Sequence, residues 1–408
     1  MGGVAYHQII AGAAGFPDAD IPMYPPASWS QIVSVGGKRM ESVFLRPEAL
    51  FVRNGRSALA MALKHAGIGA HSQVLLPAYH CPSMIEPTAW LGATIIFYPL
   101  LPSLEPDLDW LGERIEDADA LLLPHFFGFV QPATESIANL CHAAKTILIE
   151  DCAHTFWAKL GSRDAGSFGD YAIASTQKFF PGPEGGALYS ARHDLSQLEL
   201  ESVGLKYELR SLVRLCETAR RFGRGGLPAA AITGLVSILN SGRQPESSEQ
   251  REDGKSENGA PVAVDTAPES SAGEPIWFDA ADVGFAGARV CRSALKLYAH
   301  ANMIEQRQKN YLRLQEGLSG LSRAHALHGE LRGATAPYAF PLLIDDPEKD
   351  FPRLKRERLA IFRWEQLAAS DCQVSTDYRT RLLQLPCHQT LSGEELERMV
   401  ETCRRILQ

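Results

Sequence analysis

Three sequence features typical of metal-binding, nucleic-acid-binding or membrane proteins are missing. The eight cysteines include no C-x-x-C pair, which argues against a zinc ribbon or a disulfide framework and fits a reducing compartment. The net charge is -8 with no basic stripe, so a nucleic-acid partner is not expected. No window approaches the roughly 18 uninterrupted apolar residues of a membrane span, and the N-terminus lacks the regions of a signal peptide. We therefore expect a cytoplasmic protein without metal, membrane or nucleic-acid partners.

What remains is the composition of an ordinary globular protein. Hydrophobic residues make up 45% of the 408 residues and charged residues 22%, which is typical of a folded chain. This length favours a large domain plus a smaller one. Short apolar runs alternate with amphipathic segments between residues 54 and 190, which predicts a mostly parallel α/β sheet covered on both faces. The predicted strands are 73–79, 93–100, 120–128, 146–151, 170–178 and 185–190, and the predicted helices are 54–66, 84–92 and 135–145.

A polar segment rich in Pro, Ser, Glu and Gly interrupts this pattern at 243–275. Its composition cannot bury enough apolar surface to fold alone, so we predict a disordered insertion. One long amphipathic helix is predicted over 285–320. A small α+β domain follows, with a strand at 338–344, a helix around 352–368 and a last helix at 392–407 that begins with a capping box. The predicted parts are an arm (1–45), a large domain (46–242), the insertion, an interdomain helix region (276–325) and a small domain (326–408).

An acidic residue ends one of the predicted strands in the segment Ile-Glu-Asp-Cys-Ala-His. Asp151 lies at the carboxyl end of this buried strand, where open α/β sheets bind their ligands. A strand-ending Asp that only caps the next turn is the simpler alternative, and His154 could equally be a structural loop histidine.

A lysine ends the next predicted strand, in the segment Ser-Thr-Gln-Lys-Phe-Phe-Pro. Lys178 is flanked by Phe179 and Phe180, and apolar surroundings lower a lysine pKa because they disfavour the ammonium form. A neutral amine is what Schiff-base formation requires. The alternative is an exposed lysine at a strand end. Glu184 then begins a Glu-Gly-Gly turn, where backbone can approach a ligand closely.

The start of the predicted helix 54–66 offers a place for an anion. Gly55, Arg56 and Ser57 would present free backbone N–H groups and the positive end of the helix dipole. A simple helix N-cap is the alternative for this segment.

The order of these three segments resembles the DegT/DnrJ/EryC1/StrS aminotransferase family. NGRSAL resembles that family's S/N-G-T-x-A-L segment, ILIEDCAH its V-I-E-D-A-A-Q/H segment, and the spacing from Lys178 to Glu184-Gly185-Gly186 its K…G-E-G-G pattern. Further similarity lies at about 285–320 and in LQLPCHQTLSGEELERMV. The resemblance implies fold type I, with a large domain that binds pyridoxal 5′-phosphate (PLP) on a mostly parallel sheet of the seven-stranded type, and a small C-terminal α+β domain.

The resemblance also implies roles for single residues. Lys178 matches the lysine that forms the Schiff base and then moves the proton of the reaction. Asp151 matches the carboxylate that pairs with the pyridine nitrogen. His154 matches the Gln or His near the phenolic oxygen of the cofactor. Gly55, Arg56 and Ser57 match the phosphate-binding turn, and Ser175 is a further phosphate ligand two residues after the usual serine position, where this chain has Ile173.

Some family positions differ in this chain. Cys81 aligns with the aromatic residue that stacks on the cofactor ring, so Tyr79 or His80 is expected to stack instead, with no ground for choosing between them. The G-Y-N-Y-R segment is replaced by WFDAADVGFAG before residue 288, and the H-Y motif of the C-terminal part is missing. These differences put the sugar substrate in doubt and leave the cofactor chemistry intact.

The expected activity is transfer of an amino group from an amino acid to a nucleotide-linked keto sugar, with glutamate as the first candidate donor. A non-sugar ketone or aldehyde is the alternative acceptor. Two further alternatives are a PLP sugar dehydratase and a non-catalytic sensor that kept the fold. Lys178 argues against both, because the related dehydratases have histidine in its place and a sensor would not need a desolvated lysine. The resemblance further implies a homodimer with shared active sites, for which the arm and apolar residues of 285–320 are the predicted contacts, namely Phe285, Val290, Leu295 and Leu297.

Overall fold

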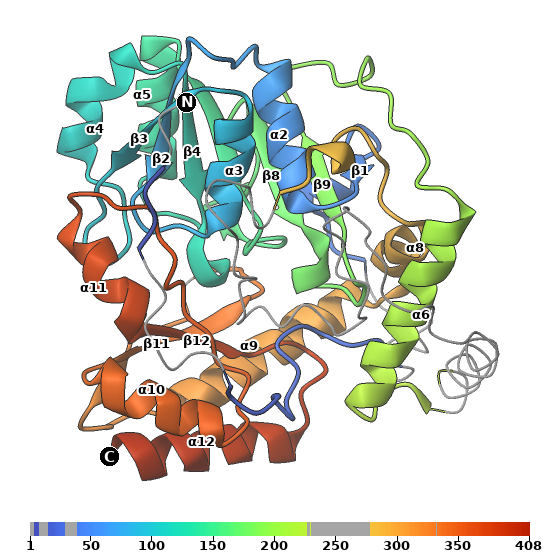
Figure 1. Ribbon diagram of the computed structural model, residues 1–408, viewed down its shortest axis with the longest axis vertical. Coiled ribbons are helices and arrows are strands. Elements are labelled where there is room, and N and C mark those ends of the chain that lie inside the picture. The colour runs from blue at the N-terminus through green and yellow to red at the C-terminus, as the bar shows by residue number, and fades with distance from the viewer. Residues whose placement is uncertain (1–3, 8–14, 29–38, 227–228, 230–277, 332) are drawn as a thin grey trace, which may run out of the picture.

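Two sheets organise the chain in the computed structural model, which describes residues 4–7, 15–28, 39–226, 229, 278–331 and 333–408. The larger sheet lies in the upper half of Figure 1 and the smaller one in the lower half, where helix α9 (His300–Gly317) runs beside it. The predicted fold class, an α/β domain with a mostly parallel sheet plus a small α+β domain, is confirmed. The predicted insertion 243–275 lies outside the described residues, and the domain boundaries stay predictions.

The large sheet has seven strands in the order β1-β9-β8-β5-β4-β2-β3. Strands β2, β3, β4, β5 and β8 pair in parallel, whereas β9 runs antiparallel to β8 and to β1. Strands β4 and β8 are buried along their whole length, as a sheet covered on both faces requires. The bounds are β1 (Leu50–Val52), β2 (Gln73–Pro77), β3 (Thr94–Tyr98), β4 (Ala120–Pro124), β5 (Ile147–Asp151), β8 (Tyr171–Ser175) and β9 (Gly186–Tyr189).

Helices cover this sheet where the sequence predicted them. Helix α2 begins after Asn54, whose side chain accepts a hydrogen bond from the Ser57 N–H and so caps the first turn. Helix α3 contains Pro87 and still continues to Trp90. The helices of this domain are α2 (Gly55–His65), α3 (Pro82–Trp90), α4 (Leu108–Arg114), α5 (Thr134–Ala144) and α6 (Leu205–Arg221).

The small domain is built on a three-stranded antiparallel sheet in the order β10-β11-β12. The capping box that the sequence predicted is present, since Ser392 and Glu395 bond each other's backbone N–H groups. The elements are β10 (Ala324–Ala326), β11 (Ala339–Ile344), β12 (Leu382–Pro386), α10 (Pro347–Arg356), α11 (Gln373–Arg381) and α12 (Gly393–Leu407).

Several predicted elements are wrong in extent, among them the strand predicted over 120–128, which ends at Pro124. Lys178 does not lie on a strand, because β8 ends at Ser175 and a single 3-10 turn, η4 (Thr176–Lys178), follows. The helix predicted over 352–368 ends at Arg356, and Arg358 then takes a left-handed φ of 62°. Beyond this point the chain is extended enough for Phe362 to bridge to β12.

The long helix predicted over 285–320 is two helices, α8 (Arg289–Leu297) and α9. Tyr298, which is extended, separates them and has its ring buried. His300 stabilises the break, because its Nε2 hydrogen-bonds the Leu295 carbonyl oxygen at 2.8 Å and satisfies a carbonyl at the end of α8. Pattern alone gave one helix because both halves carry the same apolar period.

The segment before α8 extends the large sheet beyond β1. Ala286 bridges to Val52, and the Gly287 N–H donates to the Phe51 carbonyl oxygen at 3.2 Å. A Cβ on Gly287 would lie 2.7 Å from the Val52 oxygen, so a glycine is needed for this close approach. The exposed edge of β1 is thereby covered.

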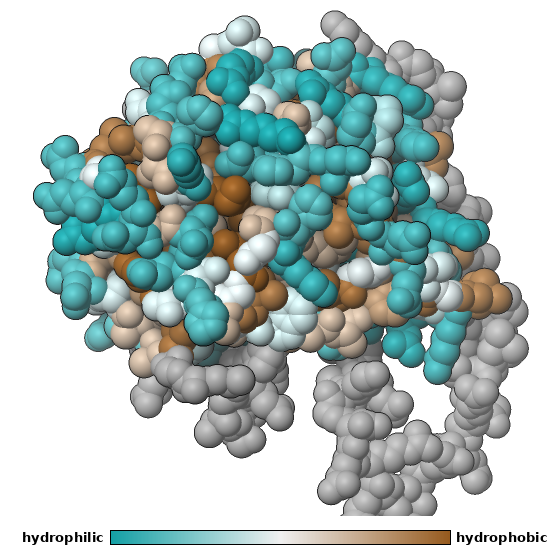
Figure 2. Space-filling view, turned by 90° about the horizontal axis from the view of Figure 1, so that it is seen from above, coloured by the Kyte–Doolittle hydropathy of each residue, from teal (hydrophilic) through white to brown (hydrophobic). Residues whose placement is uncertain are grey.

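The described residues 4–7 and 15–28 of the arm contact the small domain, whereas residues 39–45 contact the large domain and α9. Tyr6 bridges to Ala368, and His388 Nε2 lies 2.9 Å from the Pro22 carbonyl oxygen. All eight cysteines are free thiols. None of the helices in the described part of the chain is long and apolar enough to cross a membrane. Viewed from above, the surface is mostly hydrophilic with apolar side chains in scattered patches (Figure 2).

Candidate active site

Asp151 ends β5 at the carboxyl edge of the large sheet and is buried. Its Oδ1 accepts a hydrogen bond of 2.8 Å from the Ala153 N–H, and no hydrogen bond from a described residue reaches Oδ2. Burial raises the pKa of this carboxyl group, while the Ala153 N–H and the charges of Lys178 and His125 act in the opposite direction. One carboxylate oxygen is thus available to a cationic N–H group.

Lys178 ends the turn after β8, the strand next to β5 in the sheet. Burial lowers the pKa of its amine, while Cys81 and Asp151 oppose the shift and Arg56 adds to it. The Lys178 Nζ lies 5.3 Å from the centre of the Tyr338 ring. The structure therefore brings the predicted lysine and the predicted carboxylate into electrostatic contact and favours a neutral amine.

His154 is buried three residues after Asp151, and the structure determines its tautomer. Burial, together with the Lys178 charge, lowers the pKa of His154 well below its ordinary value, so the ring is neutral. Its Nδ1 accepts a 3.3 Å hydrogen bond from the Phe127 N–H, which places the ring proton on Nε2. His154 can therefore donate a hydrogen bond from Nε2 to a ligand oxygen.

The first turn of α2 supplies part of an anion site. Ser57 is not available as a ligand, because its Oγ donates toward Asn54 Oδ1 at 3.1 Å and lies 3.3 Å from the Asp282 carbonyl oxygen. Gly55 and Arg56 retain their N–H groups at the helix start. A Cβ on Gly55 would lie 3.5 Å from the Ser175 Cβ, so Ser175 stands directly beside this turn.

Neither residue predicted to stack on a cofactor ring is placed for that role. His80 has Nδ1 within 3.1 Å of two carbonyl oxygens, its Nε2 accepts from the Ala368 N–H, and its ring stacks on Phe97. Tyr79 is fully buried, 5.0 Å from the Trp364 ring. Half-buried Cys81 is the residue of this segment that acts on the pKa of Lys178. We therefore leave Tyr79 and His80 out of the proposed cofactor contacts.

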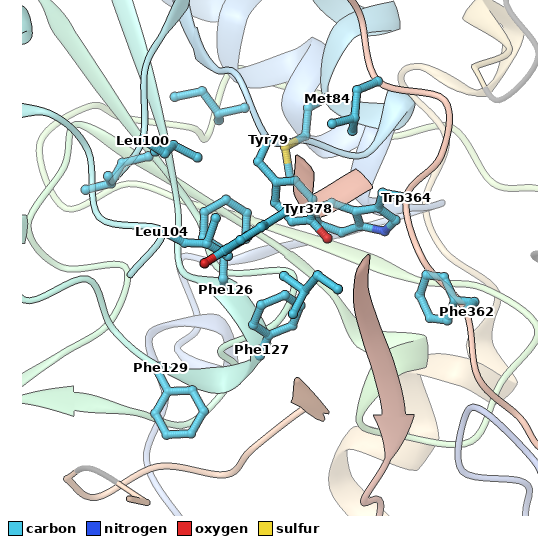
Figure 3. Close-up of a cluster of buried hydrophobic side chains, with 14 of the residues drawn as sticks. Tyr79, Met84, Leu100, Leu104, Phe126, Phe127, Phe129, Phe362, Trp364 and Tyr378 are labelled. Atoms are coloured by element: carbon cyan, nitrogen blue, oxygen red, sulfur yellow. The ribbon is translucent and has the colours of Figure 1, made fainter. Parts of the chain in front are cut away.

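A buried cluster with aromatic members from both domains (Figure 3) contacts the site at His154, through Phe127 and Trp364. Tyr79 follows β2, Phe126 and Phe127 come from the turn η3 (Phe126–Gly128), and Trp364 and Tyr378 come from the small domain. The small-domain members were not expected from the sequence, because no motif marks single aromatic residues that reach the site from distant segments.

Tyr338, at the entry to β11, is the closest small-domain neighbour of the site residues. Its ring is stacked on His154 with centroids 4.1 Å apart, and Trp364 approaches the same imidazole at 5.6 Å. Aromatic stacking of this kind fixes the plane of the histidine ring. Only the apolar period of the strand that follows Tyr338 could be recognised in the sequence.

A second polar cluster lies at the start of α2. Arg53 pairs with Asp282 at 3.0 Å and lies 3.8 Å from Glu184, and its guanidinium packs 4.2 Å from the centre of the Tyr207 ring. The Tyr207 hydroxyl donates to Glu184. Burial raises the pKa of Glu184 to about 7, although Arg53 opposes the shift. Of these residues, only Glu184 was singled out from the sequence.

His125, Glu150 and Cys152 are grouped closely enough to suggest a metal site, with ligand atoms within 4.8 Å of one another. Glu150, however, already accepts backbone N–H bonds from residues 166, 168 and 169 and a 2.9 Å bond from His125. A carboxylate saturated in this way holds the loop before β8, and we assign no metal to it.

The residues that remain fit PLP. Asp151 Oδ2 suits a ring nitrogen, Lys178 an aldehyde carbon, His154 Nε2 a phenolic oxygen, and the N–H groups of Gly55 and Arg56 a phosphate. The donor set therefore agrees with the cofactor that the sequence resemblance implied.

Comparison with known proteins supports this interpretation. Residues 40–206 match the model of the DegT/DnrJ/EryC1/StrS aminotransferase family. The chain is 28% identical over 167 residues to a putative L-glutamine:3-amino-2,3-dideoxy-scyllo-inosose aminotransferase of Micromonospora echinospora, which is 38% of this chain and 39% of the relative. It is 29% identical over 141 residues to GDP-perosamine synthase of Escherichia coli O157:H7, or 32% and 36% of the two chains. The chain thus matches less than half the length of either relative.

Solved structures share the fold over nearly the whole chain. The PLP form of the putative sugar aminotransferase Spr1654 from Streptococcus pneumoniae superposes with a TM-score of 0.63 at 15% identity, over 95% of this chain and 98% of that one. The aminotransferase TlmJ from Streptoalloteichus hindustanus gives 0.58 at 17% identity, over 88% and 86%. Residues 40–206 are thus similar to the DegT/DnrJ/EryC1/StrS aminotransferase family, and the solved structures show that the chain shares their fold.

Proposed function

We propose that this protein is a PLP-dependent aminotransferase that transfers the amino group of an amino acid to a keto group, with glutamate as the first candidate donor. The observation that carries the proposal is the presence of a buried carboxylate and a half-buried lysine at one sheet edge. Asp151 ends β5, Lys178 follows the neighbouring strand β8, and the charge of each acts on the pKa of the other. A structural carboxylate and a surface lysine would not need to share this buried place.

The residues of the site divide the work between binding and proton transfer. Asp151 holds the pyridine nitrogen and keeps it protonated. His154 orients the ring through Nε2, and Gly55, Arg56 and Ser175 bind the phosphate. When bound, the cofactor supplies a conjugated ring that accepts the electron pair released at the substrate carbon. Lys178, with its lowered pKa, is the group that removes and returns the proton at that carbon.

A nucleotide-linked keto sugar is the proposed amino acceptor. Relatives over this segment include GDP-perosamine synthases and a UDP-N-acetyl-3-dehydro-α-D-glucosamine 3-aminotransferase. A non-sugar ketone or aldehyde is the second candidate. This candidate is favoured because the rings of Tyr338 and Trp364 pack on His154, and aromatic ring faces offer few hydrogen bonds to sugar hydroxyls.

We further propose a cytoplasmic homodimer whose subunits share their active sites. Two exposed leucines of α6, Leu205 and Leu209, are 74% and 54% exposed, and Leu297 of α8 is 59% exposed. Of the residues expected at this contact, Leu295 is buried within the subunit instead. A C₂ dimer is the commonest arrangement that would cover such side chains.

The decisive experiment combines cofactor mapping with a substrate panel. Purified protein incubated with PLP should turn yellow, and borohydride should then attach the cofactor to the peptide that contains Lys178. Lys178→Ala should abolish turnover and still bind PLP non-covalently. Amino donors and keto acceptors, tested one at a time through changes in the cofactor spectrum, would identify both substrates. A labelled peptide with another lysine would refute the assignment.

A further inference from the structure

One buried cation ties three distant segments of the chain together at Lys178. Arg307, on α9, is fully buried. Its Nη2 donates to the Lys178 carbonyl oxygen at 2.8 Å, its Nη1 to the Pro337 carbonyl oxygen at 3.0 Å, and its Nε to Gln389 Oε1 at 2.7 Å. The guanidinium also packs 4.6 Å from the centre of the Phe179 ring. The turn that carries the lysine is thus bonded to the segment before β11 and to the segment after β12, which lie at the same end of the small domain's sheet.

The partners of Arg307 are unusual for a buried charge. All three acceptors are neutral oxygens, and no carboxylate pairs with this guanidinium among the residues that the structure describes. Burial lowers the pKa of Arg307 only to about 10, so it stays charged at neutral pH. An unpaired buried cation costs several kcal/mol, and a hydrophobic residue would fill the space at a lower cost. A role beyond packing is therefore expected.

Gln389 adds a second side-chain contact to the turn that carries Lys178. Its Oε1 accepts from Arg307, and its Nε2 donates to the Phe179 carbonyl oxygen at 2.8 Å. Two successive carbonyls, those of Lys178 and Phe179, are therefore held by two side chains that are bonded to each other. Because η4 is only one turn long, the backbone hydrogen bonds that close it both go to the Thr176 carbonyl oxygen. The carbonyl oxygens of Lys178 and Phe179 accept from Arg307 and Gln389 instead.

Arg307 also connects the backbone at Lys178 to the backbone before Tyr338 by hydrogen bonds. The Pro337 carbonyl that it holds belongs to the residue before Tyr338, whose ring lies against the lysine amine and stacks on His154. The Arg307 guanidinium thus holds the turn of Lys178 and the backbone before Tyr338 at a fixed separation, and the Tyr338 ring helps to shield the lysine amine from water.

We infer that Arg307 and Gln389 are positioning residues that hold the Lys178–Phe179 backbone, and through it direct the lysine amine into the site. Their importance for catalysis rests on the function proposed above for Lys178. The small domain takes part in the site by this route, since Gln389 follows β12 and Pro337 precedes β11.

The test measures Lys178 itself, apart from activity. In cofactor-free protein, the rate at which a small amine-reactive reagent modifies Lys178 is followed against pH by peptide mass spectrometry. Arg307→Met should move the midpoint upward by roughly one pH unit, because the released turn exposes the amine to water. Arg307→Lys, which keeps the charge but has fewer fixed donors, should recover part of the shift. The dissociation constant for PLP, measured by titration, should be roughly tenfold higher for Arg307→Met than for wild type.

Two further variants keep the outcome clear. Arg323→Met is the control, because Arg323 pairs with buried Asp350 at 2.7 Å in the small domain and should lose stability without moving the Lys178 midpoint. If Arg307→Met does not fold, Gln389→Leu should give a smaller shift in the same direction. A Lys178 midpoint that is unchanged in the folded variants would overturn the inference. Wild-type protein without lysine-bound PLP would refute the proposed function instead, while the midpoint comparison would still decide the role of Arg307.

Discussion

At the scale of single residues, Asp151 combines burial with an oxygen kept available. Burial alone would favour a protonated carboxyl group, and the Ala153 N–H, with electrostatic contributions from Lys178 and His125, lowers the pKa of the group in part. A bound pyridinium nitrogen would complete this compensation. The residue is therefore most stable as a carboxylate when the cofactor is present.

Replacement of Asp151 by Asn tests that interpretation. The variant should fold and bind PLP but lose roughly 10- to 100-fold in turnover, because one charge-assisted hydrogen bond is worth about 1.5–3 kcal/mol. Steady-state rates and the cofactor spectrum measure the effect. Asp107→Asn is the control, since Asp107 caps α4 far along the chain and Asn is an equally good cap. Wild-type turnover in Asp151→Asn would contradict the electron-sink role.

Glu184 leads to a pH-dependent prediction about stability. Its pKa is about 7 in the folded protein and near 4.5 in the unfolded chain, so its contribution is fully present below pH 4.5 and is lost as pH rises through 7. Glu184→Gln lacks this titration. The free energy of unfolding of the variant, compared with wild type by urea denaturation, should therefore improve as pH goes from 5 to 8. A difference that stays constant over this range would disprove the raised pKa.

The sequence could predict Asp151, His154 and Lys178 because each lies in a short local pattern next to a buried strand. Ser57 shows the limit of such patterns, since the same Asn-Gly-Arg-Ser segment that suggests a phosphate site also forms an N-cap that uses the Ser57 N–H. Arg307, Gln389 and Tyr338 could not be predicted at all. They reach the lysine through tertiary packing, and nothing in their own sequence neighbourhoods marks that contact.

At the scale of elements, the parallel core was predictable and the connections were not. Strands such as β4 and β5 are continuous apolar runs, which are recognisable because both faces of the sheet are covered. Strand β1, of three residues, is too short to show any period. The break between α8 and α9 depends on the tertiary contacts of Tyr298 and His300, which a helical period cannot reveal.

The turn η3 provides the element-scale prediction. Gly128 has a φ of 108°, and a Cβ there would lie 2.6 Å from the Pro337 Cα and 2.7 Å from the Tyr338 N. Gly128→Ala should therefore cost about 3 kcal/mol or more, because backbone would have to move. It should also weaken PLP binding, since the neighbouring Phe127 N–H holds His154. Thermal and urea denaturation measure the first effect, and PLP titration the second.

Gly161→Ala separates strain from collision in that experiment. Gly161 also has a positive φ, of 62°, but a Cβ added there would meet nothing within 4 Å. Its replacement should cost only about 1–2 kcal/mol and leave PLP binding unchanged. Equal losses in the two variants would show that the contact between η3 and the entry to β11 contributes little.

At the scale of the whole molecule, the two domains meet at the lysine. The α/β domain carries Asp151, Lys178 and the proposed anion site. The small domain carries Tyr338 and Gln389, which bonds Arg307 and the Phe179 carbonyl oxygen. The similarity to PLP-containing neighbours over 95% of the chain concerns the arrangement of both domains. The composition predicted two domains but not the residues that join them.

Assembly is the prediction that belongs to this scale. Helices α6 and α8 lie side by side at one edge of the molecule (Figure 1) and expose Leu209 and Leu297. Wild-type protein should sediment as a dimer of the 44.6 kDa chain, and dissociation should release PLP. Leu209→Glu with Leu297→Glu should shift the protein toward monomer, because charged side chains would be buried in the contact. Leu312→Glu, on α9 and 49% exposed, should not. A wild-type monomer that retains full cofactor occupancy and turnover would rule out shared sites, and dimers that survive the double replacement would place the contact on another face.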